Sequence, residues 1–145
     1  PEHPLYLDEN VRRMCQTIRL MFSELVTSLI EEGQNDKALA ALDLVMEKIP
    51  GWQVRHDLAS MQMADSYLQL GAKDKGLALL RDIVGNSLQY MRWYQTLTPS
   101  QLRTVGDYNL HAYIIQAGLT MLVDAGMQAE AEQIIADAQA SGLAM

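Results

Sequence analysis

The side chains in this sequence that could do chemistry are three histidines, one cysteine and a few clustered carboxylates. A zinc peptidase would need two histidines four residues apart on a helix, in an HExxH motif. His3, His56 and His111 are far apart, and none of them has that context. The sequence also contains no GxSxG nucleophile elbow, no Walker loop and no GxGxxG motif. It therefore predicts no metal site, no cofactor site and no catalytic centre within these residues.

The carboxylates and the cysteine have ordinary structural interpretations. Glu31, Glu32 and Asp36 cluster around a predicted turn, where a pair of carboxylates could do acid–base work. Acidic residues at a solvated turn between helices are the more common case, and we favour that interpretation. Cys15 has apolar neighbours at helical spacing, so we expect a small buried hydrophobic residue rather than a reactive thiol. A single cysteine excludes an internal disulfide.

The composition is that of an acidic globular domain, with 145 residues, 49% of them hydrophobic, and a formal net charge of −7. Nucleic-acid binding needs a concentrated basic face, and the only dense basic stretch is Arg12, Arg13 and Arg19, so we expect no nucleic-acid partner. The longest uncharged stretch, 108–123, is shorter than the roughly 20 apolar residues of a membrane span. We expect a soluble domain and, because the chain opens with Pro1 rather than methionine, a piece of a longer protein.

The elements that must position any site are amphipathic helices. Asp8 or Asn10 can cap a first helix, which continues to Glu32 and ends at Gly33. Its apolar residues recur every three or four positions, the period of one helix face. They are Val11, Met14, Cys15, Ile18, Met21, Phe22, Leu25 and Leu29.

The same arrangement of helix, glycine turn and helix recurs along the chain. Asn35-Asp36 is expected to cap a second helix that stops at Pro50-Gly51, and the short turn between the two helices predicts an antiparallel hairpin. A second pair turns at Gly71, with Asp74 as the expected cap of its second helix, and a third pair turns at Gly126.

Spacing identifies these hairpins as similar to tetratricopeptide repeats. With Gly33 at the turn, the large, small and proline positions of that pattern are filled by Phe22, Leu25, Leu29, Ala38, Leu42 and Pro50. The turn glycines lie 38 and then 55 residues apart, against a repeat period of about 34. We predict an all-α fold of two to three irregular repeats with about six to seven helices.

The predicted boundaries form a single helical-repeat domain over residues 1–145. An N-terminal extension, 1–7, precedes a first hairpin at 8–50, a second at 55–97 and a third at 99–142.

The long insertion before the third hairpin has the most distinctive local sequence. Tyr90, Trp93 and Tyr94 form an aromatic patch that could be a binding platform or could cover the end of a repeat stack. Thr98 and Gln101 form a capping box around Pro99, from which one helix is predicted to run to Ala125.

The first helices of such hairpins form a concave surface, which is the candidate partner-binding groove. Its predicted lining mixes polar and apolar side chains and lacks the basic set that would clamp a peptide carboxylate. The residues are Leu20, Ser23, Thr27, Ile30, Glu31, Met61, Asp65, Leu68, Gln69, Gln116, Thr120 and Asp124.

Several local sequences give a more specific resemblance. They are Tyr6-Leu7-Asp8-Glu9-Asn10-Val11-Arg12-Arg13-Met14, Met21-Phe22-Ser23-Glu24-Leu25, Leu29-Ile30-Glu31-Glu32-Gly33 with Asp36-Lys37-Ala38, and Trp93-Tyr94-Gln95-Thr96-Leu97. Together they resemble the C-terminal region of the DUF2723 membrane proteins of Bacteroidetes, which look like protein O-mannosyltransferases. The resemblance covers about residues 6–102. It implies a helical-repeat tail behind a multi-span glycosyltransferase-like region, which would hold the catalytic positions.

Three hypotheses for function follow. The first is a non-catalytic interaction or scaffolding domain on a membrane glycosyltransferase, attached to the bacterial inner membrane on the periplasmic side. Its partner would be a protein, a peptide or the membrane domain of its own parent chain. The second is a free-standing tetratricopeptide adaptor in a soluble complex, with a cytoplasmic location as the alternative. The third is an enzyme whose site lies between the long helix and the groove.

Overall fold

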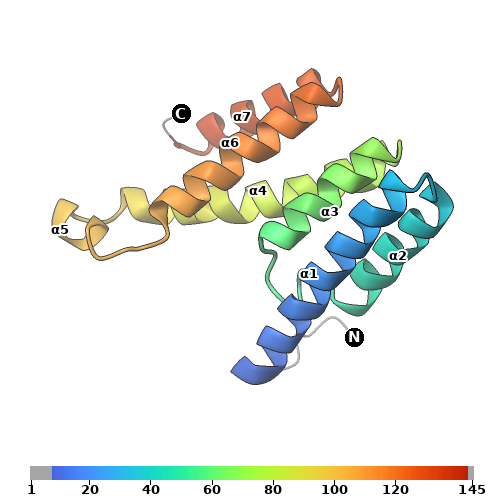
Figure 1. Ribbon diagram of the computed structural model, residues 1–145. Coiled ribbons are helices and arrows are strands. Elements are labelled where there is room, and N and C mark those ends of the chain that lie inside the picture. Colours follow the sequence, from blue (N-terminus) through green and yellow to red (C-terminus); the bar gives the residue numbers. More distant parts are fainter. Residues whose placement is uncertain (1–7, 144–145) are drawn as a thin grey trace. The chain divides into compact units, whose positions relative to one another are not determined.

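The computed structural model describes residues 8–143, which form seven helices and contain no strand (Figure 1). This confirms the all-α fold expected from the sequence. The expected extension at 1–7 lies outside the described residues. The helices are α1 (Glu9–Glu31), α2 (Asn35–Lys48), α3 (Leu58–Gln69), α4 (Lys73–Gln95), α5 (Pro99–Leu102), α6 (Tyr108–Asp124) and α7 (Gln128–Ala140). Contacts divide the chain into two compact units, Pro1–Leu79 and Leu80–Met145, with the boundary inside α4.

Four of the helices end in the same way, at a glycine with positive φ. These glycines are Gly33, Gly71, Gly126 and Gly142. At the first of them, the Gly33 N–H donates to the carbonyl of Ile30 and the Gln34 N–H donates to that of Leu29, at 3.0 and 2.8 Å. The other three turns repeat this pair of bonds, which satisfies carbonyls that the helix leaves free. The turn glycines read from the sequence are therefore confirmed.

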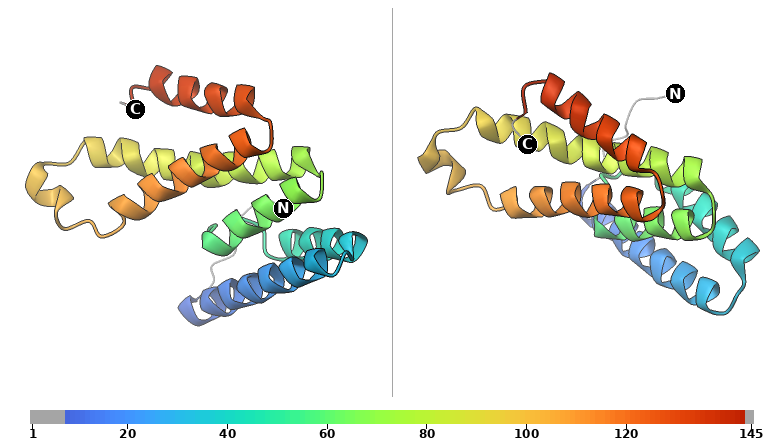
Figure 2. Two further views of the ribbon diagram at one scale, coloured as in Figure 1. Left: turned by 45° about the horizontal axis from the view of Figure 1, so that its top comes forward. Right: turned by 90° about the horizontal axis from the view of Figure 1, so that it is seen from above.

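In the first unit, α1 and α2 form an antiparallel hairpin, and α3 packs on α1 (Figures 1 and 2). Its core is made of small and medium apolar side chains that are almost fully buried, namely Val26, Ala38, Leu42, Val45, Met63 and Ala64. Ala38 has no exposed surface, which agrees with the small residue that the repeat pattern requires there.

In the second unit, the C-terminal part of α4 is followed by the short α5 and by the hairpin of α6 and α7 (Figure 2). Its buried residues include Leu80, Val84, Ile115, Leu122, Ala131 and Ala138. Gly118 permits a close approach, because a Cβ atom there would lie 2.5 Å from Cγ2 of Val84.

The helix predicted from Thr98 to Ala125 is interrupted. The capping box of Thr98 and Gln101 forms as expected, but α5 ends at Leu102 and the next helix begins at Tyr108. The Thr104 hydroxyl donates to the Gln101 carbonyl at 2.7 Å, and Gly106 follows two residues later. A side chain that competes for a backbone carbonyl and a glycine both oppose helix continuation, which accounts for the break.

Two of the predicted caps are also wrong. Asn35 is the first residue of α2 rather than its cap, and Gln34 occupies the cap position without a side-chain hydrogen bond to the backbone. Asp74 lies inside the first turn of α4, where its charge still suits the positive end of the helix dipole. At α1, by contrast, the Asp8 carboxylate accepts from the Val11 N–H at 2.9 Å, so that cap is confirmed.

The apolar periodicity of α1 identifies the helix but not its buried face. The residues of α1 that are buried are Arg19, Ser23 and Val26. Val11 and Leu25, two members of the predicted apolar stripe, are exposed. Cys15 is only half-buried.

Candidate functional site

A fully buried arginine fastens the loop between α2 and α3 to α1. Arg19 Nη2 donates to the carbonyls of Ile49 and Val54, each at 3.0 Å, and Nη1 donates to that of Arg55 at 2.9 Å. Asp57 Oδ2 lies 3.7 Å from Nη1. Burial lowers the pKa of Arg19, although the carboxylate of Asp57 opposes this shift. Arg19 thus belongs to the interior of the first unit and not to an exposed basic face.

Because it holds this loop, Arg19 also sets the position at which α3 begins. The Asp57 carboxylate accepts from the Ser60 N–H at 3.1 Å, and the Ser60 hydroxyl accepts from the Asp57 N–H at 3.3 Å. This is a capping box, the reciprocal arrangement that satisfies two free amides at a helix start. The first turn of α3 is therefore fixed beside the middle of α1.

A groove of about 510 Å³ lies between the first turn of α3 and α1. Leu20 and Leu58 supply exposed apolar surface to it, with 48% and 54% of each residue accessible. The other residues of the lining are mostly polar. The complete lining is Arg13, Gln16, Thr17, Leu20, Asp57, Leu58 and Ala59.

The lining combines apolar surface with two side chains of opposite charge, Arg13 and Asp57. Arg13 also pairs with Glu9, at 2.6 Å, on the exposed surface of α1. Such a surface can bury an apolar side chain of a partner while Gln16 and Thr17 hydrogen-bond to polar groups beside it.

Several predicted groove residues on α1 and α3 bind the two helices to each other instead. The Ser23 hydroxyl has no exposed surface and lies 3.2 Å from Gln62 Oε1, and Gln62 Nε2 donates to the Thr27 hydroxyl at 3.1 Å. Met61 is buried as well, with 4% of its surface exposed. Of the predicted lining, only Leu20 belongs to the groove.

The remaining predicted positions are spread over both units. Ile30 is half-buried and Glu31 is exposed near the end of α1. On α3, Leu68 packs against Gly76, while Gln69 Nε2 donates to Asp65 at 2.7 Å. The predicted α6 residues share one exposed face of that helix in the second unit, and they are Gln116, Thr120 and Asp124.

Sequence reasoning missed most of the groove because it placed the lining about one helical turn too far along α1 and α3. The missed residues are Arg13, Gln16, Thr17, Asp57, Leu58 and Ala59. The signal that could have located the groove is the sequence Asp57-Leu58-Ala59-Ser60. Asp57 is the cap residue and Leu58 follows it at once, so the Leu58 side chain lies on the first turn of α3, where it is exposed.

A second polar cluster joins α2, α3 and the start of α4. Asp43 accepts from the Tyr67 hydroxyl at 2.8 Å and from Lys75 Nζ at 2.7 Å. Partial burial of Asp43 opposes ionisation, but the two hydrogen bonds prevail and lower its pKa overall. Burial and the bond to Asp43 raise the pKa of Tyr67, so this hydroxyl stays protonated and acts as a donor. The cluster is suited to holding helices together rather than to abstracting a proton.

The aromatic patch of the second unit is largely a packing device. The Tyr90 ring stacks on His111 with centroids 4.2 Å apart, and His111 Nδ1 lies 3.0 Å from the Ser87 hydroxyl. Tyr94 is 2% exposed, and its burial raises its pKa. Trp93, with 50% of its surface accessible, is the member of the patch available to a partner.

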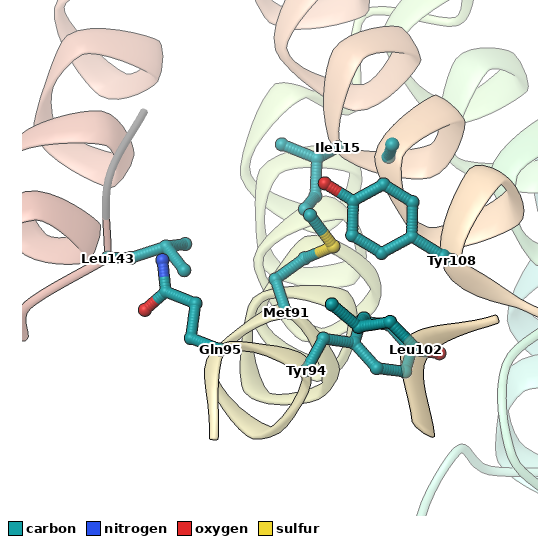
Figure 3. A pocket seen from close by; sticks show the side chains of 8 residues that line it. Met91, Tyr94, Gln95, Leu102, Tyr108, Ile115 and Leu143 are labelled. Atoms are coloured by element: carbon teal, nitrogen blue, oxygen red, sulfur yellow. The ribbon is translucent and has the colours of Figure 1, made fainter. Parts of the chain in front are cut away.

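Tyr94 also lines an apolar pocket of about 420 Å³ in the second unit. Figure 3 shows the Met91 thioether and the Tyr108 ring near its centre, with Gln95 and Leu143 at one side. Leu102, Ala112 and Ile115 complete the lining, so that no charged side chain contributes to it. The pocket can accept an apolar side chain or another neutral apolar group.

The described residues, 8–143, contain no cluster of three or more histidine, cysteine or acidic side chains able to hold a metal ion. Over the same residues, no helix is both long and apolar enough to cross a bilayer. Comparisons of this chain with protein families, with curated proteins and with solved structures find no match.

Proposed function

We propose that this chain is a non-catalytic interaction domain that holds a segment of another polypeptide in the groove between α1 and α3. The observation that supports this is the pair of exposed leucines, Leu20 and Leu58, which line one groove together with Arg13 and Asp57. Exposed leucines are not unusual by themselves. Here Arg19 of α1 holds the loop that precedes α3, and a capping box fixes the first turn of α3, which carries Leu58. Preorganised apolar anchors of this kind contribute most to affinity in protein interfaces.

The larger protein that we propose is a multi-span membrane protein of the glycosyltransferase-like type, with this domain as its C-terminal tail on the periplasmic side. The support is the sequence resemblance over about residues 6–102. In that setting, the groove would hold an acceptor protein, a partner subunit or part of the parent chain. A free-standing adaptor with the same groove is the alternative, and the coding sequence upstream of Pro1 distinguishes the two. Several hydrophobic spans in the same reading frame would support the membrane protein, whereas a nearby start codon would contradict it.

Photocrosslinking tests the groove directly. A photoreactive phenylalanine analogue at position 20, in the natural full-length protein and in its source cell, is expected to form an adduct with one main partner. The same analogue at Leu44, an equally exposed residue on α2 outside the groove, serves as the control.

Substitution adds a quantitative criterion. Leu58→Asp places a charge where the partner's apolar group would be buried, so the adduct at position 20 should fall by about tenfold or more. Equal adducts at positions 20 and 44, or an adduct insensitive to Leu58→Asp, would rule out the groove as the binding surface.

A further inference from the structure

The pocket of about 420 Å³ in the second unit is built from four separate segments of the chain. Its described lining takes three residues from the C-terminal part of α4, one from α5, three from α6, and Leu143 after α7. All of them belong to the second unit, and none of them lines the groove proposed above. The volume lies within the range of about 300–1,000 Å³ that small-molecule pockets occupy.

The break between α5 and α6 makes this pocket possible. Along one continuous helix, Leu102 and Ile115 would lie about 20 Å apart, because each residue advances the helix axis by about 1.5 Å. The helix instead ends at Leu102, and the turn that contains Gly106 brings Leu102 and Ile115 into the same lining. The interruption that the sequence pattern did not predict therefore opens a cavity.

Local hydrogen bonds hold the lining in place without a ligand. The capping box of Thr98 and Gln101 fixes α5, which carries Leu102. After α7, Gly142 turns the chain with a φ of 90°, and the Leu143 N–H donates to the Ala138 carbonyl at 3.1 Å. A ligand that enters such a preformed site pays little for ordering the chain around it.

The lining favours a neutral aromatic ligand. Because the described lining has no charged side chain, a charged ligand would lose its hydration without gaining a partner. The rings of Tyr94 and Tyr108 lie with centroids 5.5 Å apart and planes 51° apart, and Figure 3 shows the Met91 thioether in the same pocket. Edge contacts with tyrosine rings and contacts with a sulfur favour an aromatic ring over an aliphatic group of equal size.

Tyr94 supplies a buried polar group to this apolar lining. The residue is 2% exposed, and within residues 8–143 its hydroxyl makes no hydrogen bond to another protein group. Burial raises the pKa of Tyr94, so the hydroxyl stays protonated at neutral pH and can donate. A buried donor without a partner lowers stability, and a ligand oxygen that accepts from it removes this cost.

We propose that this pocket binds a neutral small molecule that has an aromatic ring and one hydroxyl or carbonyl oxygen, with the Tyr94 hydroxyl as donor to that oxygen. An aromatic side chain of another protein carries a similar ring, and the choice of probes below separates these two sources. The proposal does not depend on the groove of the first unit.

A titration of the 145-residue chain with 2-naphthol, followed by amide NMR shifts, tests the pocket. The dissociation constant is expected to be roughly 100 µM, as for other ligands of this size. The shifts should gather on residues 91–95, 108–115 and Leu143, which include most of the lining.

Three further probes define the ligand class. Decahydro-2-naphthol has the same carbon skeleton without aromatic rings and should bind about three- to tenfold more weakly. The anion 2-naphthalenesulfonate should bind at least about tenfold more weakly, because the lining offers it no cation. N-acetyltryptophanamide, which stands for a protein side chain with its backbone, should also bind more weakly than 2-naphthol.

Two alanines of α6 give a matched pair of variants. Ala112 and Ala117 are both half-buried, but only Ala112 belongs to the described lining. Ala112→Met fills the pocket and should lower the affinity for 2-naphthol at least about tenfold, whereas Ala117→Met should leave it unchanged. Tyr94→Phe should lower the affinity for 2-naphthol about three- to tenfold and leave that for naphthalene unchanged. Thermal melts by circular dichroism verify that the variants are folded.

The absence of 2-naphthol binding to the unchanged chain, or equal binding to Ala112→Met and Ala117→Met, would overturn the pocket. Equal or tighter binding of the decahydro compound or of the sulfonate would overturn the neutral aromatic class. Tighter binding of N-acetyltryptophanamide than of 2-naphthol would overturn the assignment to a free small molecule. The groove is tested by adducts at position 20, so failure of one proposal can be recognised separately from failure of the other.

Discussion

The two units of this chain bury their helices by different chemistry. In the first unit, the centre of α1 turns Arg19 and Ser23 inward, and both are fully buried. In the second, α6 buries Ile114, Ile115 and Leu122 together with Gly118, and its His111 Nδ1 lies 3.0 Å from the hydroxyl of the buried Ser87. Both units have an apolar core, but the first also encloses a fully buried arginine whose three hydrogen bonds fix a loop, whereas the second encloses a close approach of two helices at Gly118.

The buried arginine also bears on which residues of α1 are exposed. Because a polar core side chain must find hydrogen bonds, it selects one loop conformation, and Arg19 does so with three carbonyls. Five apolar residues of α1 are exposed instead, namely Val11, Met14, Ile18, Met21 and Leu25. In α6 the interior takes Ile114, Ile115 and Leu122, yet Tyr113 and Val123 are still 59% and 47% exposed on the face that carries Gln116 and Thr120.

The largest expected effect comes from removing the buried arginine. Arg19→Met should destabilise the chain by about 3–5 kcal/mol, because it leaves the carbonyls of Ile49, Val54 and Arg55 buried without their donor. Urea denaturation followed by circular dichroism measures the change. Arg19→Lys should recover only part of the loss, since a single ammonium cannot reproduce the planar fork.

Arg13→Met is the matched control for that prediction. It removes the same charge from the same helix, but its side chain is 70% exposed, so the change should stay within about 0.5 kcal/mol. Equal effects at positions 13 and 19 would show that the buried hydrogen bonds of Arg19 contribute little to the stability of the first unit.

The stability of the second unit should depend instead on the volume of the side chains at its helix contacts. Gly118→Ala is expected to cost about 1–3 kcal/mol, because the new methyl group would meet Val84 at 2.5 Å. Gly85→Ala, within α4, should stabilise by up to about 1 kcal/mol, since nothing lies within 4 Å of its Cβ position and alanine favours the helix. Melting temperatures of the two variants should therefore move in opposite directions. A shift of the same sign in both would show that packing around Gly118 is loose.

Local sequence signals predicted the fold well because they act within a few residues. The turn glycines, the Asp8 cap and the capping box of Thr98 each depend on backbone groups one turn away. A neighbouring side chain or the choice of glycine decides such features whatever the rest of the chain does.

The face of α1 that is buried, and hence most of the groove, could not be predicted in this way. Arg19 finds its carbonyl partners 30 to 36 residues further along the chain, and no pattern within the helix shows that they will be there. Periodicity assigns apolar residues to the interior, so the predicted stripe is displaced around α1 from the face that buries Arg19, Ser23 and Val26. The apolar stripe of α1 was therefore visible in the sequence, but the exposure of five of its members was not.

The smallest predicted change in stability comes from the Asp43 cluster. It compares hydrogen bonds near the surface of the first unit with the buried ones of Arg19. Bonds from Lys75 and Tyr67 lower the pKa of Asp43 in the folded chain. Its stabilising contribution is then complete above the ordinary pKa of an aspartate, about 4, and is lost as the pH falls through the folded value. Since Asp43 and Lys75 are about half exposed, the pair should be worth no more than about 1 kcal/mol.

Urea denaturation of the unchanged chain and of Asp43→Asn should differ at pH 7 and converge near pH 2.5. Tyr67→Phe, which removes one donor and keeps the ring, should show a smaller difference with the same dependence on pH. A difference that is equal at both pH values would mean that Asp43 acts through packing and not through its charge. A difference as large as that of Arg19→Met would show that the polar support of the first unit extends from its centre to its surface.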